Sequence, residues 1–137
     1  MVWATVGEGA LDPAALEASV RRRAAGAVVT FSGVVRDQDG GRAVASREYS
    51  AHPAAEGMLA RLAVEQLAAH PAVQAMAVGH RVGPLEVGDV AFAAACSAAH
   101  RADAFAACAD LVDAVKAGLP VWKRQHFDNG DDEWVGL

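Results

Sequence analysis

The residues of this chain best suited to amine chemistry are its two lysines, Lys116 and Lys123; every other basic residue apart from histidine is an arginine. A lysine amine that is crowded or desolvated can lose its proton and act as a nucleophile or a base, whereas arginine stays charged. The alternative is that Lys116 only complements a helix dipole and that Lys123 is a solvated strand residue. Because both lie close together, beside Pro120 and Trp122, we treat them as candidate catalytic residues.

The segment between the lysines predicts a reversal of the chain. Gly118 is typical of a residue just past a helix end, and Pro120 cannot continue a helix. We therefore expect Lys116 in the last turn of a helix and Lys123 on the extended segment that follows. This arrangement would allow both amines to point into one cleft.

Arg36 is a further candidate, because it follows a short core strand predicted over residues 27–32 and precedes an acidic, glycine-rich stretch at residues 37–41. That stretch has no apolar anchor and is expected to be a mobile loop. The alternative for Arg36 is an ion pair with Asp37 or Asp39.

His100 and Arg101 lie at a junction between a predicted strand and a predicted helix. The amides and the dipole of a helix start attract anions, and these two side chains could close on one. The alternative is a capping and surface role. A second His-Arg pair, His80 and Arg81, precedes a Gly-Pro turn and is interpreted as structural.

The remaining pattern predicts a single α+β domain over residues 1–137, with helices packed on a mixed or antiparallel sheet. Asp12 and Pro13 predict a helix start, and the helix is expected to run through the arginines at 21–23 to Gly26. Further helices are expected over about 54–70 and from about 102, the latter with an apolar stripe at Phe105, Cys108, Val112 and Val115. Strands are expected at 2–6, 27–32, 43–49, 73–80 and 90–97, with a turn at 81–84 and a final hairpin ending near Trp134.

Composition excludes several classes of protein. The formal net charge of −5 argues against a nucleic-acid binder, and no apolar run reaches the length of a membrane span. There is no signal-peptide pattern, so a cytoplasmic protein is expected. Cys96 and Cys108 lack metal-site spacing and are expected to be small buried residues, while the histidines are scattered singly, so no metal site is expected.

Six residues have no ready structural explanation, and they would together form a cationic pocket in an acidic protein: Arg36, His100, Arg101, Lys116, Lys123 and Arg124. Such a pocket suits a small polyanion, such as a phosphate ester or a carboxylate. Crowded cations also lower one another's pKa, which favours amine chemistry near neutral pH.

Several motifs in order resemble the catalytic subunit family of molybdopterin synthase, from about residue 26 to 135. They are Phe31 to Arg36, His80 to Gly83, Ser97 to Arg101, and Lys116 to Arg124, followed by Gly130 and Trp134. The resemblance implies an α/β hammerhead fold, consistent with the α+β prediction.

The resemblance also implies an activity. Such a sulfurtransferase places two sulfurs on cyclic pyranopterin monophosphate, making the molybdopterin dithiolene of molybdenum cofactor biosynthesis. The sulfur comes from the thiocarboxylated C-terminus of a small ubiquitin-like subunit, so no further cofactor is implied. Two large subunits would form a central homodimer with one small subunit at each end, a heterotetramer.

The family's functional positions map onto residues of this chain. Lys116 corresponds to the essential lysine and Lys123 to a supporting one. Arg36, His100 and Arg101 correspond to contacts with the pterin and phosphate, the latter two reaching across the dimer interface. Flanking substrate contacts fall on Val34, Val35, Arg124 and Gln125.

The chain departs from the family at Gln125, where an acidic residue is usual, and at Ser50 and His52. Two other functions remain open at this point. One is a lysine Schiff-base lyase acting on a phosphorylated sugar, and the other is an inactive paralogue that binds a pterin phosphate without transferring sulfur.

Overall fold

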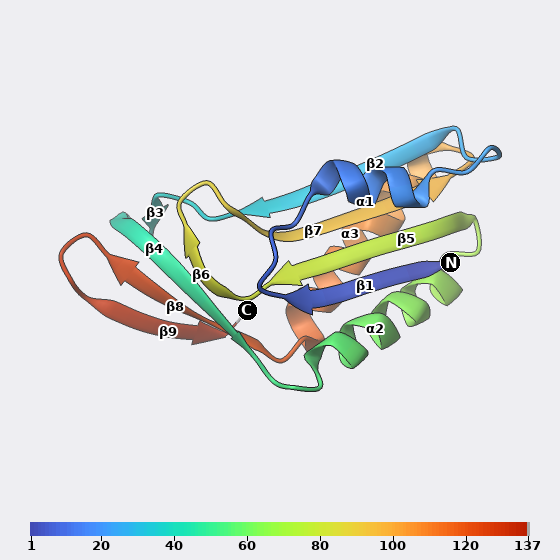
Figure 1. Ribbon diagram of the computed structural model, residues 1–137. Coiled ribbons are helices and arrows are strands. Elements are labelled where there is room, and N and C mark those ends of the chain that lie inside the picture. Colours follow the sequence, from blue (N-terminus) through green and yellow to red (C-terminus); the bar gives the residue numbers. More distant parts are fainter. Residues whose placement is uncertain (137) are drawn as a thin grey trace.

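The computed structural model describes residues 1–136, so Leu137, the last residue of the expected domain, lies outside the described residues. Figure 1 shows two sheets side by side, with all three helices packed on one of them. The elements in chain order are β1 (Val2–Gly7), α1 (Pro13–Val20), β2 (Ala27–Val34), β3 (Gln38–Asp39), β4 (Arg42–Ala51), α2 (Ala55–Ala69), β5 (Val73–Arg81), β6 (Gly83–Glu86), β7 (Val90–Ala98), α3 (Arg101–Gly118), β8 (Val121–Phe127) and β9 (Asp132–Gly136).

The first sheet has the strand order β1-β5-β7-β2, with β1 parallel to β5 and the other pairs antiparallel. Alternate residues of its central strands face opposite layers. Ala93 and Ala95 pack toward Leu16 and Val20 of α1, while the intervening positions join the core beneath α2 and α3. Small alanine side chains let helices approach both faces closely. The predicted α+β fold with a mixed sheet is confirmed.

The second sheet has the order β3-β4-β8-β9, and β6 pairs with β4 on the edge opposite β8. The prediction of a turn at residues 81–84 is wrong. Only Val82 separates β5 from β6, and Gly83, with φ +88°, redirects the chain from the first sheet into the second. This crossing joins the two sheets and brings the end of β5 against β4.

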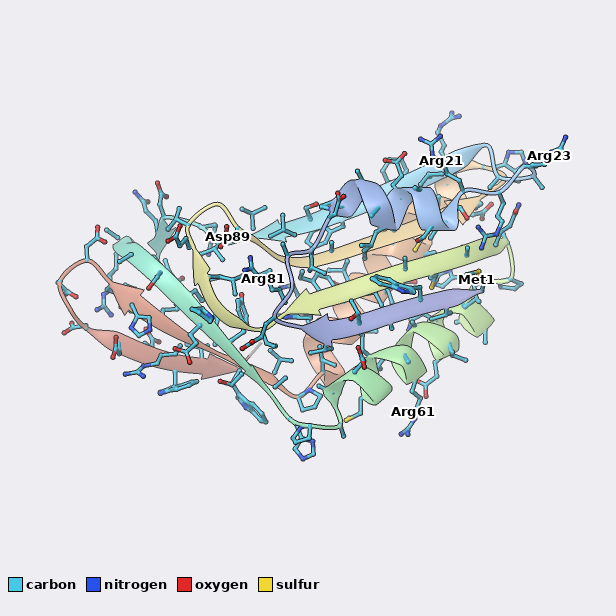
Figure 2. The ribbon with its side chains drawn as sticks, in the orientation of Figure 1. Met1, Arg21, Arg23, Arg61, Arg81 and Asp89 are labelled. Carbon is cyan, nitrogen blue, oxygen red and sulfur yellow. The ribbon has the colours of Figure 1, made fainter. Side chains whose placement is uncertain are left out.

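The first helix begins as predicted but ends early. The Asp12 side chain accepts a hydrogen bond from the Ala14 amide at 3.0 Å. Beyond Val20, however, the chain leaves the helix, because the residues at 21–23 are charged and offer no apolar surface to bury on the sheet. Arg21 and Arg23 instead lie at the end of the molecule remote from the β8–β9 hairpin (Figure 2).

The long helix α3 buries a different stripe from the one expected. Cys108, Val112 and Val115 are buried as predicted, but Phe105 is 62% exposed. The stripe continues through Ala104, Ala107 and Leu111, residues that the larger aromatic side chain obscured in the sequence. Cys96 and Cys108 are both buried free thiols in this core, which confirms their interpretation.

Two local predictions about the segment after Gly26 were also wrong. The strand β2 was expected to be a core strand, yet it is the edge strand of the first sheet and none of its residues is fully buried. The stretch at 37–41 forms the tight β3–β4 hairpin, because Gly40 and Gly41 both adopt positive φ, as a two-residue hairpin turn requires. Among residues 1–136, none of the helices combines the length and the apolar character needed to cross a membrane.

Candidate functional site

The pocket that gathers the candidate lysines has a volume of about 270 Å³ and lies where the C-terminal end of α3 meets the second sheet. It also receives residues from the ends of β2, β5 and β7. Its lining residues are Gly33, Val34, Arg36, Arg47, Tyr49, His80, Ala91, Phe92, Val115, Lys116 and Lys123. Four of these side chains are Lys or Arg, and none is Asp or Glu, so within the described residues the lining is cationic.

Lys116 and Lys123 both line this pocket, as the reversal between them predicted. Lys116 lies in the last turn of α3, which ends at Gly118, and Lys123 lies on β8. The Leu119 amide donates to the carbonyl of Val115 at 2.9 Å and closes the helix end. The chain then turns back, so a helix end and a strand present their amines to one space.

The alternation of β8 separates its basic residues. Lys123 shares a face with the buried Gln125, while Arg124 points to the opposite face. Arg124 forms an ion pair with Asp132 at 2.5 Å and stacks near the Trp134 ring, 5.6 Å from its centroid. Arg124 therefore does not line the pocket of its own chain.

Two other predicted contacts are buried beside the pocket rather than exposed in it. Val35 is 1% exposed and belongs to the hydrophobic core, and Gln125 is fully buried. Val34 does line the pocket, because a register irregularity between Gly33 and Val34 turns the end of β2. Gln125 reaches the site through its hydrogen bond to Arg47.

Arg36 lines the pocket near its mouth, where its side chain is 72% exposed. One guanidinium nitrogen, Nη2, lies 3.8 Å from Oδ1 of Asp39, the ion pair that the sequence offered as an alternative. An exposed pair at this distance contributes little to stability and is screened by salt. Arg36 is therefore free to exchange Asp39 for an anionic ligand.

His100 and Arg101 lie elsewhere. They line a separate hollow with residues near Gly26, at the start of α3. A helix rises about 1.5 Å per residue, so Arg101 and Lys116 are separated by about 22 Å along the axis. One chain cannot bring both ends of α3 into the same small pocket.

Three lining residues with polar side chains escaped the sequence analysis: Arg47, Tyr49 and His80. Arg47 and Tyr49 lie opposite Gln125 and Lys123 in the β4–β8 pairing, so all four share one face. Because side chains alternate between the two faces of a strand, the sequence of residues 43–49 could have shown that Arg47 and Tyr49 share a face. It could not have shown that this strand pairs with β8. His80 was interpreted as structural, and only the crossing from β5 to β6 shows that it also lines the pocket.

The pocket perturbs the titration of its own groups. Burial lowers the pKa of Lys123, the positive charges of Arg47, Lys116 and Arg36 lower it further, and Asp39 opposes them. Burial likewise lowers the pKa of His80 to about 4, outweighing the hydrogen bond that its Nδ1 donates to the Arg81 carbonyl at 2.8 Å. His80 is thus neutral near neutral pH.

We expect Lys123 to titrate below the ordinary lysine pKa of 10.5, because of this desolvation and crowding. Reductive methylation with ¹³C-formaldehyde would yield separate NMR signals for the two lysines, assigned with Lys123→Arg. Asp39→Asn should lower the pKa of Lys123 further, since it removes a carboxylate that favours the ammonium form. A Lys123 signal titrating at or above the ordinary value would contradict this electrostatic description.

The geometry suits the binding and turnover of a small anion. Two arginines can hold a phosphate or carboxylate, and two amines converge beside it. A neutral His80 stacks edge-on against Tyr49, with ring centroids 4.9 Å apart, and forms an apolar wall. The site can therefore combine anion binding with an amine close to the reacting atoms.

The family model described as "MoaE protein" matches residues 6–118. A protein of Nostoc sp. named "Molybdopterin synthase catalytic subunit" is 40% identical over 113 residues, which cover 82% of this chain and 68% of that protein. A protein of Thermoplasma volcanium with the same name is 35% identical over 133 residues, covering 96% of each.

A solved structure supports the same relationship in three dimensions. The crystal structure of molybdopterin synthase from Staphylococcus aureus matches with a TM-score of 0.88 and 29% sequence identity, covering 96% of each chain. The likeness therefore extends over both sheets and all three helices, including the elements that form the pocket.

Proposed function

This chain belongs to the MoaE family, and from that membership and the pocket geometry we propose that it is the catalytic subunit of a molybdopterin synthase. The observation that carries the proposal is the convergence of Lys116 and Lys123 with Arg36 in one cationic pocket. Relatives with this name match over most of the chain, and the two lysines and the arginine to which we assign the reaction line one pocket.

The proposed substrate is cyclic pyranopterin monophosphate, which receives two sulfurs on adjacent side-chain carbons. Arg36 at the pocket mouth is suited to its phosphate, because an exposed guanidinium can exchange a weak ion pair for two phosphate oxygens. Val34 and the aromatic wall of Tyr49 and His80 offer apolar surface for the pterin.

The proposed sulfur donor is a small ubiquitin-like subunit with a thiocarboxylated C-terminus. In each transfer a carbon–sulfur bond forms at a side-chain carbon of the pterin while a carbon–oxygen bond at that carbon breaks, and the displaced oxygen stays on the phosphate or leaves as water. Water then attacks the acyl carbon of the carrier, the bond between that carbon and sulfur breaks, and the carrier ends as an ordinary carboxylate. No further cofactor is needed for this exchange. A negatively charged tail also complements the cationic pocket.

Lys116 is proposed to stabilise the charge that develops as sulfur leaves the thiocarboxylate, with Lys123 in support. Lys116 is exposed at the end of α3, where an incoming tail can reach it. Lys123 lies deeper, half-buried against β4, where its position is fixed by the sheet. An amine held on rigid elements beside the reacting atoms needs little reorganisation during the reaction.

A homodimer is part of this proposal, as the core of a heterotetramer with two small subunits. Because His100 and Arg101 lie at the far end of α3 from Lys116, they could assist a pocket only if it belonged to another copy. Arg124 lies on the outer face of β8, so it too could contribute only to the pocket of another copy. These three residues are therefore proposed to act across the dimer interface rather than within one chain.

The test is conversion of cyclic pyranopterin monophosphate to molybdopterin by the purified protein with a thiocarboxylated small subunit. We expect product to accumulate in proportion to the thiocarboxylate consumed, two sulfurs for each product molecule. A stable complex with the small subunit but no product would favour the inactive, pterin-binding alternative. Borohydride trapping of substrate on Lys116 would instead support a Schiff-base lyase.

A further inference from the structure

Arg47 is a buried cation without a buried anion to match it. It is 7% exposed on β4, and its guanidinium is held by two neutral groups. Nη1 donates to the Tyr49 hydroxyl at 3.2 Å and Nη2 donates to Oε1 of Gln125 at 2.7 Å. Within residues 1–136 no carboxylate forms an ion pair with Arg47, and its buried Nε has no hydrogen-bond partner.

Such an arrangement is costly unless something else compensates the charge. An arginine side chain cannot be deprotonated in a protein, and burying its charge unpaired is unfavourable. Its guanidinium has five N–H donors, of which the two contacts above use only part. Because Arg47 lines the same pocket as Lys116 and Lys123, the missing counter-charge can come from a ligand.

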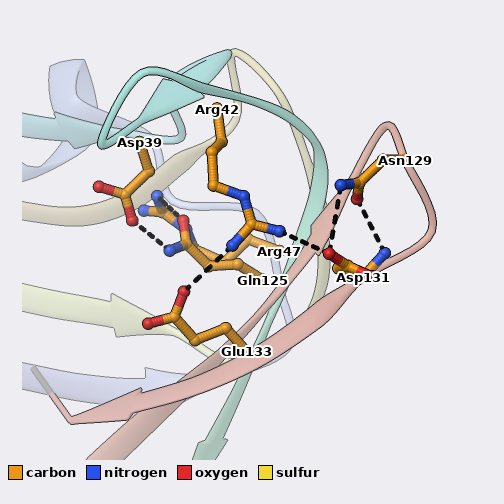
Figure 3. A network of polar contacts seen from close by, with 7 residues as sticks. All are labelled: Asp39, Arg42, Arg47, Gln125, Asn129, Asp131 and Glu133. Atoms are coloured by element: carbon orange, nitrogen blue, oxygen red, sulfur yellow. Dashed lines mark hydrogen bonds and ion pairs between the residues drawn. The ribbon is translucent and has the colours of Figure 1, made fainter.

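Gln125 holds Arg47 in this position through its amide. The amide oxygen accepts from Arg47, and the amide nitrogen Nε2 donates to Oδ2 of Asp39 (Figure 3). A carboxylate oxygen can only accept and a guanidinium can only donate, so the orientation of the amide is determined by its two neighbours. The other oxygen of Asp39 faces Arg36, so the β3–β4 hairpin is linked to both pocket arginines.

We propose that Arg47 is a further anion-binding residue of this pocket, and that Asp39 and Gln125 position its guanidinium. The ligand class is a phosphate group, and in assigning it to the substrate's phosphate the inference rests on the proposed function. Arg36 binds from the exposed mouth, while Arg47 supplies charge from the buried floor. A glutamine at position 125, rather than an acid, leaves the charge of Arg47 available to the ligand.

Gln125→Glu provides a nearly isosteric test of the positioning role. The new carboxylate would accept from Arg47 and neutralise it, yet it could not donate to Asp39 and would repel that carboxylate. Arg47→Gln removes the charge itself. Arg42→Gln is the matched control, because Arg42 lies on the same strand and carries the same charge, but pairs with Asp131 at 3.1 Å outside the pocket (Figure 3).

The experiment is calorimetric titration of the full chain and each variant, at constant ionic strength, with inorganic phosphate and separately with cyclic pyranopterin monophosphate. We expect Arg47→Gln and Gln125→Glu to weaken binding of both probes by about tenfold or more, as loss of a charge-assisted hydrogen bond predicts. Arg42→Gln should bind within about twofold of the wild type, and Arg47→Lys should recover part of the affinity.

Binding that is unchanged in folded Arg47→Gln and Gln125→Glu, or a wild type that binds neither probe, would overturn the inference. Far-ultraviolet circular dichroism of each variant establishes that the fold is retained, and Gln125→Glu serves if Arg47→Gln does not fold. The titrations involve no turnover. A protein that binds phosphate through Arg47 but makes no molybdopterin would therefore refute the proposed function alone.

Discussion

Replacing Lys116 with alanine is expected to reduce the rate of molybdopterin formation by roughly 10² to 10³-fold, the usual cost of removing a group that stabilises developing charge. Lys116→Arg is expected to be nearly as inactive. Arginine keeps the positive charge, but its planar guanidinium spreads that charge over a larger group and occupies more space at the end of α3 than a compact ammonium. The measurement is single-turnover formation of product with preloaded thiocarboxylate, so that substrate binding and chemistry are separated.

The effect of Lys116 should be on chemistry and not on folding. Its side chain is exposed, so thermal unfolding of both variants should match the wild type closely. Arg61→Ala, on the exposed surface of α2 (Figure 2), is the control for loss of a cation remote from the pocket and should keep full activity. Substantial activity in Lys116→Arg would show that a positive charge is sufficient and that the amine itself is not required.

Acidification is expected to destabilise this protein through His80 by about 3 kcal/mol between neutral pH and about pH 4. The pKa of His80 is lowered from 6.5 to about 4 in the folded chain by burial. Between these two pKa values, His80 is protonated in the unfolded chain and neutral in the folded chain. The free energy of unfolding therefore falls as the pH drops through this window. Above about pH 6.5 both states carry neutral histidine and the stability contribution is complete.

The measurement is the free energy of urea unfolding of the wild type and of His80→Phe at a series of pH values. Phenylalanine keeps aromatic contacts with Tyr49 and Phe92, whose ring centroids lie 4.9 and 5.8 Å from that of His80. We expect the variant to lose about 3 kcal/mol less than the wild type on acidification, although the carboxylates titrate in both. Parallel pH dependences of the two proteins would show that His80 does not titrate as its burial implies.

Some features of the site could be predicted from short stretches of sequence, because they depend on local chemistry. The helix start at Asp12 and Pro13 follows from capping and from the fixed φ of proline. The placement of Lys116 on a helix end and Lys123 on a strand follows from the intervening Gly118 and Pro120. These signals depend only on near neighbours in the chain, so they predict the local structure independently of the tertiary packing.

The alternation along β8 was also available in the sequence, yet it was not enough to sort the site. A period of two separates Arg124 from Lys123 and Gln125, but it does not show which face is covered by β4. The same limit applied to α1, whose end depends on how much apolar surface the sheet offers beyond Val20. A local sequence pattern therefore shows which conformations and faces are possible for a segment. The apolar surface that the rest of the fold offers decides which of them is adopted.

The amino-acid sequence by itself determined the α+β class, the family resemblance and the pair of amines in a cationic setting. Only the tertiary structure decided that Arg47 and Tyr49 from β4 and His80 from β5 complete the pocket, and that His100 and Arg101 lie at the far end of α3. The physical reason is that strand pairing and sheet crossing join residues many positions apart. The direction and partners of such contacts follow from the packing of the whole chain, and no short stretch encodes them.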